Sequence, residues 1–278
     1  MILIGLTGSL ATGKSTVSRL LSAPPYSLPI IDADVLARRV VEPGTYGYRQ
    51  IISKFLPTTP DLLLLHDDDS ETSKLWRDRG LGQPINRAAL GRRVFGEQPE
   101  RRRDRAVLNG IIHPLVRFEM AKAVLWYHFL GHWAVVLDIP LLYESGLDVF
   151  CGVVVMVAVS DVEVQMRRLR DRDRGLSEQE ARDRVGSQIG VGEKVERTRA
   201  RGPRRGKVVQ NDGGLEELGG EVKRVVSEIR GEGGGLLWEV WLWGSPVGAA
   251  GVAAWEVWRS WKVRRRWEQE RVREKAKL

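Results

Sequence analysis

The feature that most constrains this chain is a glycine-rich loop close to its first residue. Residues 8–15 read Gly-Ser-Leu-Ala-Thr-Gly-Lys-Ser, which matches the pattern G-x-x-x-x-G-K-S. The apolar run of residues 2–6 precedes the loop, and Val17, Leu20 and Leu21 follow it with helical spacing. A strand, a loop of this pattern and a helix together form a phosphate-binding loop. We therefore predict a nucleotide site in an α/β domain.

The residues of this loop have separate tasks. Glycines allow backbone N–H groups to curve around phosphate oxygens, and the start of the helix adds the positive end of its dipole. Lys14 supplies a cation for the β- and γ-phosphates, and the Ser15 hydroxyl is a ligand for Mg²⁺. A glycine-rich turn that binds nothing is the alternative, and the full motif in its required context argues against it. The predicted ATP-binding residues are Gly8, Ser9, Leu10, Ala11, Thr12, Gly13, Lys14, Ser15 and Thr16.

Apolar, β-branched runs alternate with helical patterns through most of the remaining chain. The expected strands are residues 28–31, 134–139, 153–159 and 207–210. The expected helices are residues 34–41, 51–55, 86–95, 104–126 with a break at His113-Pro114, 161–174, 177–188 and 215–229. Residues 57–83 and the basic residues 197–207 are expected to be surface insertions. This alternation predicts a parallel sheet flanked by helices.

Two carboxylates follow the second expected strand. After Ile31 the chain continues Asp32-Ala33-Asp34. Open parallel sheets bind ligands at the carboxyl ends of their strands, and a carboxylate there can accept the proton of a hydroxyl that attacks a γ-phosphate. We assign this base to Asp34, whereas Asp32 is equally suited to capping the next helix. The alternative is that both residues are only caps.

Several stretches resemble the dephospho-CoA kinase family, in the family's order. Residues 31–44 read I-D-A-D-V-L-A-R-R-V-V-E-P-G, and similar segments follow at residues 86–91, 108–115, 138–144, 165–173 and 187–188. The resemblance spans about residues 1–229. It implies a P-loop NTPase fold with a helical lid and a helical CoA-binding region. It also implies phosphorylation of the ribose 3′-hydroxyl of dephospho-CoA by ATP, the last step of coenzyme A synthesis.

The resemblance extends to individual residues of the acceptor side. The second aspartate of D-A-D is the base in that family, and this role passes to Asp34. Arg38 is predicted to bind substrate phosphates, with a solvated helical arginine as the alternative. Asp138 either holds the water shell of the metal or is structural. The candidate acceptor-binding residues are Asp32, Arg38, His113, Pro140, Leu141 and Glu144.

An arginine-rich segment at residues 161–174 resembles the lid helix of the family. Arg168 and Arg172 are four residues apart and share one helix face. In the family such an arginine stabilises the charge that develops on the transferring phosphoryl group. A solvated face of arginine–aspartate pairs is the alternative. Asn211 resembles the residue that contacts adenine, although Gln210 and Asp212 depart from the commoner residues beside it.

The C-terminal segment differs in composition from the rest of the chain. The formal net charge is +8, and residues 259–278 hold nine Lys/Arg and three Asp/Glu, so the basicity is concentrated at this end. Seven of the ten tryptophans also lie in the last 41 residues. We therefore divide the chain into a kinase domain at residues 1–232 and a glycine linker, Trp-rich apolar segment and basic tail at residues 233–278.

The tail has the composition of a membrane-attachment segment. Residues 240–255 are uncharged, and tryptophans and then basic residues flank them, which suits an interfacial belt on an anionic membrane. Gly244-Ser245-Pro246 interrupts the stretch, which is short for a span. An extra helix packed on the kinase body is the alternative. With no targeting sequence before the first strand, we expect a cytoplasmic protein. The arrangement resembles that of some fungal members of the family, which implies attachment to an organelle, such as the mitochondrial outer membrane or the endoplasmic reticulum.

Two other functions are compatible with these motifs. A phosphate loop, a carboxylate base and lid arginines would serve a nucleoside monophosphate kinase or another small metabolite kinase equally well. A membrane-tethered nucleotide-binding scaffold would need the loop without turnover. Nucleic acid is not an expected partner, because the basic clusters lack a recognition module.

Overall fold

The computed structural model describes residues 1–64, 74, 78–173, 182, 190–231 and 246–275. These residues form two compact units. The first consists of Met1–Ile31 and Tyr127–Leu278, and the second of Asp32–Trp126. The expected helix at residues 177–188 and the glycine linker from residue 232 lie outside the described residues.

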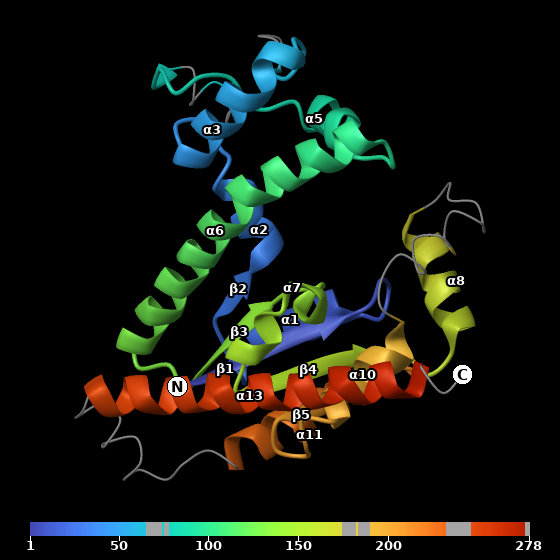
Figure 1. Ribbon diagram of the computed structural model, residues 1–278. Helices are drawn as coiled ribbons and strands as arrows, with labels where there is room; N and C mark the ends of the chain where they lie inside the picture. Colours follow the sequence, from blue (N-terminus) through green and yellow to red (C-terminus); the bar gives the residue numbers. More distant parts are fainter. Residues whose placement is uncertain (65–73, 75–77, 174–181, 183–189, 232–245, 276–278) are drawn as a thin grey trace. The chain divides into compact units, whose positions relative to one another are not determined.

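A parallel sheet of five strands forms the centre of the first unit (Figure 1). Its strands are β1 Ile2–Gly8, β2 Ile30–Asp32, β3 Ala134–Asp138, β4 Val153–Ala158 and β5 Gly206–Gln210, and their order is β2-β3-β1-β4-β5. The register pairs Leu6 with Asp138 on one side of β1 and Gly8 with Val157 on the other. The ends of β3 and β4 therefore flank the start of the glycine-rich loop. The α/β fold predicted from the sequence is confirmed.

Helices cover both faces of this sheet. On one face, α1 Lys14–Ser22 and α11 Leu215–Gly231 pack on a core that includes Ile4 and Leu6. Gly5 points to the opposite face, because successive strand residues alternate. A Cβ atom on Gly5 would lie 2.6 Å from Cys151 Sγ. The elements on that face are α7 Leu142–Ser145, the 3₁₀ helix η2 Leu147–Phe150 and α10 Val191–Arg199.

Two further helices complete the first unit. Helix α8 Val162–Arg172 follows β4, and Asp161 caps it by accepting a hydrogen bond from the Glu163 N–H at 2.8 Å. Helix α13 Pro246–Lys275 is the last described element and packs against η2. No helix among the described ranges is long and apolar enough to cross a bilayer.

The second unit is helical and has a core of its own. Its elements are α2 Ala33–Arg39, α3 Tyr46–Phe55, the 3₁₀ helix η1 Leu56–Thr58, α5 Arg87–Val94 and α6 Pro99–Phe129, whose last residues belong to the first unit. One core cluster consists of the buried side chains Tyr48, Ile51, Phe55, Leu62, Ile85 and Val94. Thr45 and Asn86 cap α3 and α5 through their side-chain oxygens.

Two expectations about local structure are wrong. Helix α6 continues through Pro114, where a break was expected. Proline removes a helical hydrogen bond at a cost of about 3 kcal/mol. Packing on both sides offsets that loss, because Leu108 and Ile111 pack on the core before the proline and Met120 is buried after it.

Residues 197–207, expected to be a basic surface loop, instead form the end of a helix and the start of a strand, and several of their basic side chains are buried. The chain completes α10 and then enters β5. Arg201 and Arg205 are each no more than 9% exposed. Arg201 donates to the Cys151 carbonyl at 2.7 Å, and Arg205 donates to the Gly152 carbonyl at 3.1 Å. Buried guanidinium groups with such partners are structural, and a count of basic residues does not distinguish them from solvated ones.

Candidate active site

The glycine-rich loop has a backbone shape that its sequence makes possible. Gly13, which precedes α1, has φ 92°, a left-handed conformation that glycine adopts readily. A Cβ atom on Gly8 would lie 2.7 Å from Thr12 Oγ1 and 3.1 Å from the Val157 carbonyl oxygen. Thr12 Oγ1 itself donates to the Ser9 carbonyl at 2.9 Å. Both glycines of the motif are therefore required by geometry.

Two amide side chains from distant elements support the loop. Asn211, after β5, donates through Nδ2 to the Thr12 carbonyl at 2.8 Å. Gln165, on α8, donates through Nε2 to the Leu10 carbonyl at 2.7 Å. Both side chains are buried. Asn211 thus supports the phosphate loop, and its predicted contact with adenine stays a prediction. Gln165 lies in a stretch that resembles the family, but its sequence context does not indicate this role.

Lys14 and Asp138 form an ion pair at the carboxyl ends of β1 and β3. The two side chains are 16% and 5% exposed. Ser15, the next residue of α1, is exposed. The carboxylate and the hydroxyl are oxygen donors of the kind that Mg²⁺ accepts alongside phosphate and water, so the residues fit this ion. No cluster of three or more acidic, histidine or cysteine side chains among the described residues forms a metal site by itself.

Arg168 and Arg172 of α8 make different contacts. Arg168 donates to the carbonyls of Asn211 at 2.8 Å and Gly213 at 3.5 Å, so it connects α8 to the segment after β5. Arg172 pairs with its neighbour Asp173 at 3.0 Å. The first contact supports a positioning role, and the second is the solvated pair expected as the alternative. The phosphoryl-transfer role of Arg168 and Arg172 stays a prediction.

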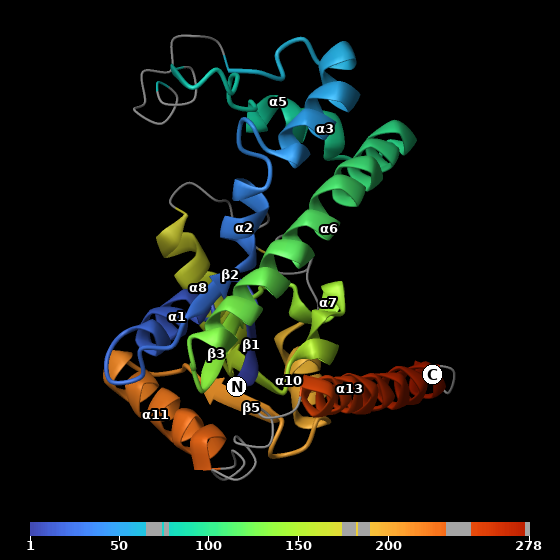
Figure 2. The same cartoon turned by 90° about the vertical axis from the view of Figure 1, so that its left-hand side faces the viewer.

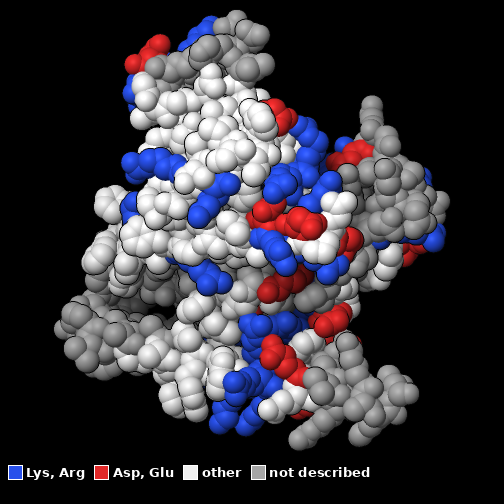
Figure 3. Space-filling model, turned by 45° about the horizontal axis from the view of Figure 1, so that its top comes forward, with Lys and Arg blue, Asp and Glu red and all other residues white. Residues whose placement is uncertain are grey.

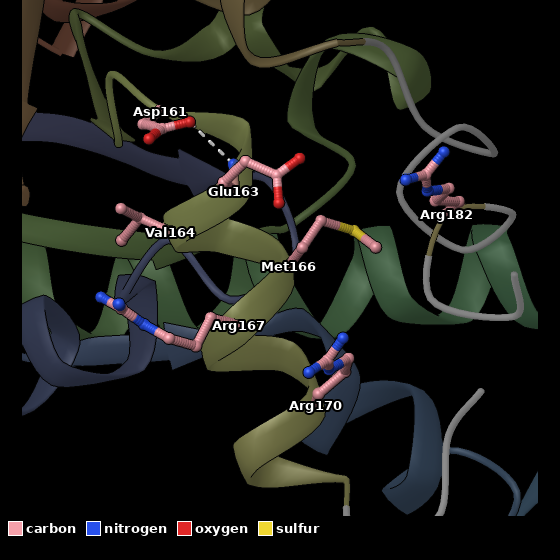
Figure 4. Close-up of a pocket in the computed structure, with 7 residues that line it drawn as sticks. All are labelled: Asp161, Glu163, Val164, Met166, Arg167, Arg170 and Arg182. Carbon is pink, nitrogen blue, oxygen red and sulfur yellow. Dashed lines mark hydrogen bonds between the residues drawn. The ribbon is translucent and has the colours of Figure 1, made fainter. Parts of the chain in front are cut away.

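A cavity of about 290 Å³ opens beside α8 (Figure 4). The residues that line it are Asp161, Glu163, Val164, Met166, Arg167, Arg170 and Arg182. Three arginines and two carboxylates therefore line the cavity, so its charge alone does not define a ligand. Arg167 and Arg170 were not predicted as site residues, because helical spacing alone does not tell which arginines of a helix face a cavity.

The loop after β3 is held in place from two sides. The Pro140 carbonyl accepts hydrogen bonds from Thr7 Oγ1 at 3.0 Å and from Lys194 Nζ at 3.4 Å. Lys194, on α10, is fully buried and also pairs with Glu144 at 2.9 Å. Leu141 is 45% exposed between these anchors. Lys194 was missed because nothing in the sequence separates it from the solvated basic residues around it.

The other predicted acceptor residues lie in the second unit. Asp32 caps α2, because its Oδ1 accepts from the Asp34 N–H at 2.8 Å and the Val35 N–H at 3.0 Å. Asp34 and Arg38 are exposed and lie four residues apart, on one face of α2. His113 is exposed on α6. The capping role that was the alternative for Asp32 is confirmed, and the predicted substrate contacts of Asp32, Arg38 and His113 stay predictions.

Comparison with known proteins identifies the family. The family model described as dephospho-CoA kinase (CoaE) matches residues 2–217. The chain belongs to the dephospho-CoA kinase family. It is 40% identical over 230 residues to the dephospho-CoA kinase CAB5 of Saccharomyces cerevisiae, covering 83% of each chain. It is 40% identical over 214 residues to the dephospho-CoA kinase of Geobacillus kaustophilus, covering 77% of this chain and 90% of that one.

Solved structures support the same fold. A Thermus thermophilus protein, TT1252, is 29% identical with a TM-score of 0.54, over 82% of this chain and 97% of that chain. A dephospho-CoA kinase from Campylobacter jejuni is 23% identical with a TM-score of 0.56, over 82% and 96% of the two chains, and at this identity it supports the fold alone. Helix α13 lies beyond the residues that the dephospho-CoA kinase model matches.

Proposed function

We propose that this dephospho-CoA kinase transfers the γ-phosphoryl group of ATP to the ribose 3′-hydroxyl of dephospho-CoA, giving coenzyme A and ADP. The observation that carries the proposal is the supported phosphate loop of the first unit. Its backbone shape depends on Gly8 and Gly13, and Asn211 and Gln165 hold it from outside. The chain's membership of the dephospho-CoA kinase family identifies dephospho-CoA as the phosphoryl acceptor.

The reaction exchanges one P–O bond for another. The 3′-oxygen forms a bond to the γ-phosphorus as the bond to the β-phosphate oxygen breaks, and ADP leaves. We assign the proton of the attacking hydroxyl to the Asp34 carboxylate. Backbone N–H groups of residues 8–15 and the Lys14 ammonium stabilise the charge on the β- and γ-phosphates. The arginines of α8 add positive charge toward the transferring group.

The proposed metal is Mg²⁺. Bound to the phosphates, it neutralises charge on the β- and γ-oxygens. The Ser15 hydroxyl would be its protein ligand, and Asp138 would accept hydrogen bonds from its waters. We expect EDTA to abolish transfer and added Mg²⁺ to restore it. Full activity in EDTA would contradict this assignment.

The acceptor distinguishes this proposal from its main alternative. The full chain is incubated with ATP and either dephospho-CoA, AMP or UMP, and products are measured by mass spectrometry. We expect phosphorylation of dephospho-CoA at the 3′-position and little of the nucleotides. Preferential phosphorylation of AMP or UMP would support a nucleoside monophosphate kinase instead. ATP binding without transfer to any acceptor would support a scaffold.

The charges on one face of the molecule are mixed. On the face shown in Figure 3, Lys and Arg are interspersed with Asp and Glu, and no single basic surface dominates that view. Several cations are paired: Arg93 lies 2.7 Å from Asp104, and Arg224 lies 2.7 Å from Glu221. A protein that binds nucleic acid collects such cations on one face.

We also propose that one face of α13 binds an anionic membrane surface. Trp255 and Trp258 are 58% and 46% exposed, with ring centroids 5.0 Å apart. Lys262 lies 5.0 Å above the Trp258 ring. Exposed indole rings beside cations suit the interface of an anionic bilayer. Attachment to the cytoplasmic surface of an organelle would follow.

Vesicle binding tests this second proposal. The full chain is sedimented with vesicles of phosphatidylcholine alone or with added phosphatidylserine. We expect binding only to the anionic vesicles, and loss of binding in the Trp255→Ala/Trp258→Ala variant. Equal binding by the variant, or none by the parent chain, would contradict the proposal.

A further inference from the structure

Helix α13 contributes an interior face to the unit that holds the phosphate loop. It runs beside α10 in both Figure 1 and Figure 2. Ser260, 1% exposed, accepts a hydrogen bond from Arg205 at 2.7 Å. Arg264 lies 3.6 Å from the Asp148 carboxylate. With Trp267, these residues are spaced three or four apart and share one face of the helix.

Asp148 is the centre of this interface. It is 2% exposed on η2, and three guanidinium groups approach it: Arg201 at 3.4 Å, and Arg197 and Arg264 each at 3.6 Å. Burial raises the pKa of its carboxyl group, and the guanidinium groups oppose that shift. A buried carboxylate depends on all of its partners, because each removed cation leaves charge uncompensated. Arg264 of α13 is one of them, so α13 belongs to the packing of this unit.

A second contact reaches from α13 toward the candidate active site. The guanidinium carbon of Arg197, on α10, lies 5.1 Å from the Trp267 ring centroid and 4.6 Å from the Tyr143 ring centroid. Arg197 is only 8% exposed between these rings. Tyr143 belongs to α7, directly after the Pro140 loop, and its hydroxyl lies 2.6 Å from Thr198 Oγ1.

The same helix anchors the loop itself. Lys194 lies on α10 one turn before Arg197, and it holds Glu144 at 2.9 Å and the Pro140 carbonyl at 3.4 Å. Trp267 thus contacts α10 at Arg197, and α10 in turn contacts the loop through Lys194. The loop and the start of α7 contain Pro140, Leu141 and Glu144, the acceptor-binding candidates of the first unit.

We propose that Trp267 is a positioning residue for acceptor binding, which acts by holding Arg197 against Tyr143 and thereby fixing the residue 140–144 loop. This inference rests on the proposed function for the identity of the acceptor and for the predicted contact of residues 140–144 with it. In this proposal α13 contributes to acceptor binding by the kinase, in addition to any role in membrane attachment. We expect the larger effect on the acceptor. Thr7 connects Pro140 to the strand before the phosphate loop, but the carbonyls of the loop itself are held by Asn211 and Gln165, which do not contact Trp267 or Arg197.

Steady-state kinetics of full-chain variants in the absence of lipid test the proposal. The test variant is Trp267→Ala, and Trp267→Phe restores an aromatic face. Trp261→Ala is the matched control, because Trp261 is 43% exposed on the same helix and also stacks on an arginine, Arg265, at 4.2 Å. We expect Trp267→Ala to raise the acceptor KM about 3- to 30-fold, the range between an exposed and a desolvated cation–π contact. The KM for ATP should stay within about twofold, and Trp267→Phe should recover most of the loss.

Hydrogen exchange separates the inference from the assignment of the acceptor. Peptides that cover residues 140–144 should exchange faster in Trp267→Ala than in Trp261→Ala, whichever acceptor the enzyme uses. Equal exchange in the two variants would overturn the inference. So would an equal rise in both KM values without rescue by phenylalanine, because that pattern indicates a general loss of structure. Failure of the parent chain to phosphorylate dephospho-CoA would instead overturn the proposed function.

Discussion

Replacing Gly13 by alanine tests whether Asn211 supports the phosphate loop as described. A Cβ atom at position 13 would lie 2.2 Å from Asn211 Nδ2, so the amide would have to leave the Thr12 carbonyl. Thr12 is fully buried, and an unsatisfied buried acceptor costs about 1–3 kcal/mol. The left-handed backbone at φ 92° adds about 1–2 kcal/mol for alanine. We expect Gly13→Ala to lower the free energy of unfolding by about 2–5 kcal/mol.

A double-mutant cycle isolates the shared contact. Asn211→Ala alone should cost about 1–3 kcal/mol, because it breaks the same hydrogen bond. The double variant should therefore be about as stable as Gly13→Ala alone, which makes the two losses non-additive by about 1–3 kcal/mol. Urea unfolding followed by circular dichroism measures each term. Gly219→Ala is the control, since nothing lies within 4 Å of its added Cβ atom on α11. Additivity within about 0.5 kcal/mol would refute this account of the loop.

Three further predictions follow from the described residues. Burial raises the pKa of the Cys151 thiol to about 12, so a thiol reagent at pH 8 should label it only in denaturant, and rapid labelling of the native chain would contradict its burial. The hydrogen bond from the Ser160 N–H lowers the pKa of Asp212, so this carboxylate stabilises the fold above its unfolded pKa, about 3.9, and the stabilisation is lost as pH falls through the lower folded pKa. Asp212→Asn should therefore make the free energy of unfolding depend less on acid pH. An unchanged pH profile of unfolding would count against the contact. A Cβ atom on Gly47 would lie 2.3 Å from the Val40 carbonyl oxygen, so Gly47→Ala should cost about 3 kcal/mol by overpacking the second unit, and an unchanged urea midpoint would disprove this.

The fold and the phosphate loop could be predicted because their signals are local. Motif residues 8–15 follow a strand and open a helix, and the buried parallel strands are continuous apolar runs. The contacts that support the loop could not be predicted. Asn211 lies 199 residues from Thr12, and Gln165 lies 155 residues from Leu10. The spacing of apolar residues along the chain does not indicate contacts between residues so far apart in the sequence.

The basic residues show the limit of composition most clearly. Lys194, Arg201 and Arg205 belong to the same strongly basic background as the solvated arginines of α8, yet they are buried. Their acceptors are a carboxylate on η2 or α7 and backbone carbonyls, which only the folded chain brings near. Composition is also insufficient for the C-terminal tail. Its tryptophans indicate an interface, but the sequence does not show that Trp267 lies against Arg197 while Trp261 is exposed.

The most direct test of the central claim is the rate of coenzyme A formation by Asp34→Asn beside Lys14→Ala. Asp34 is exposed in the first turn of α2, so its amide variant should keep the parent thermal stability within the small effect of a helix dipole. We expect kcat to fall about 10²- to 10⁴-fold in Asp34→Asn, the contribution of a general base, and ATP turnover to be lost in Lys14→Ala. Folded variants that both form coenzyme A at the parent rate would contradict the account.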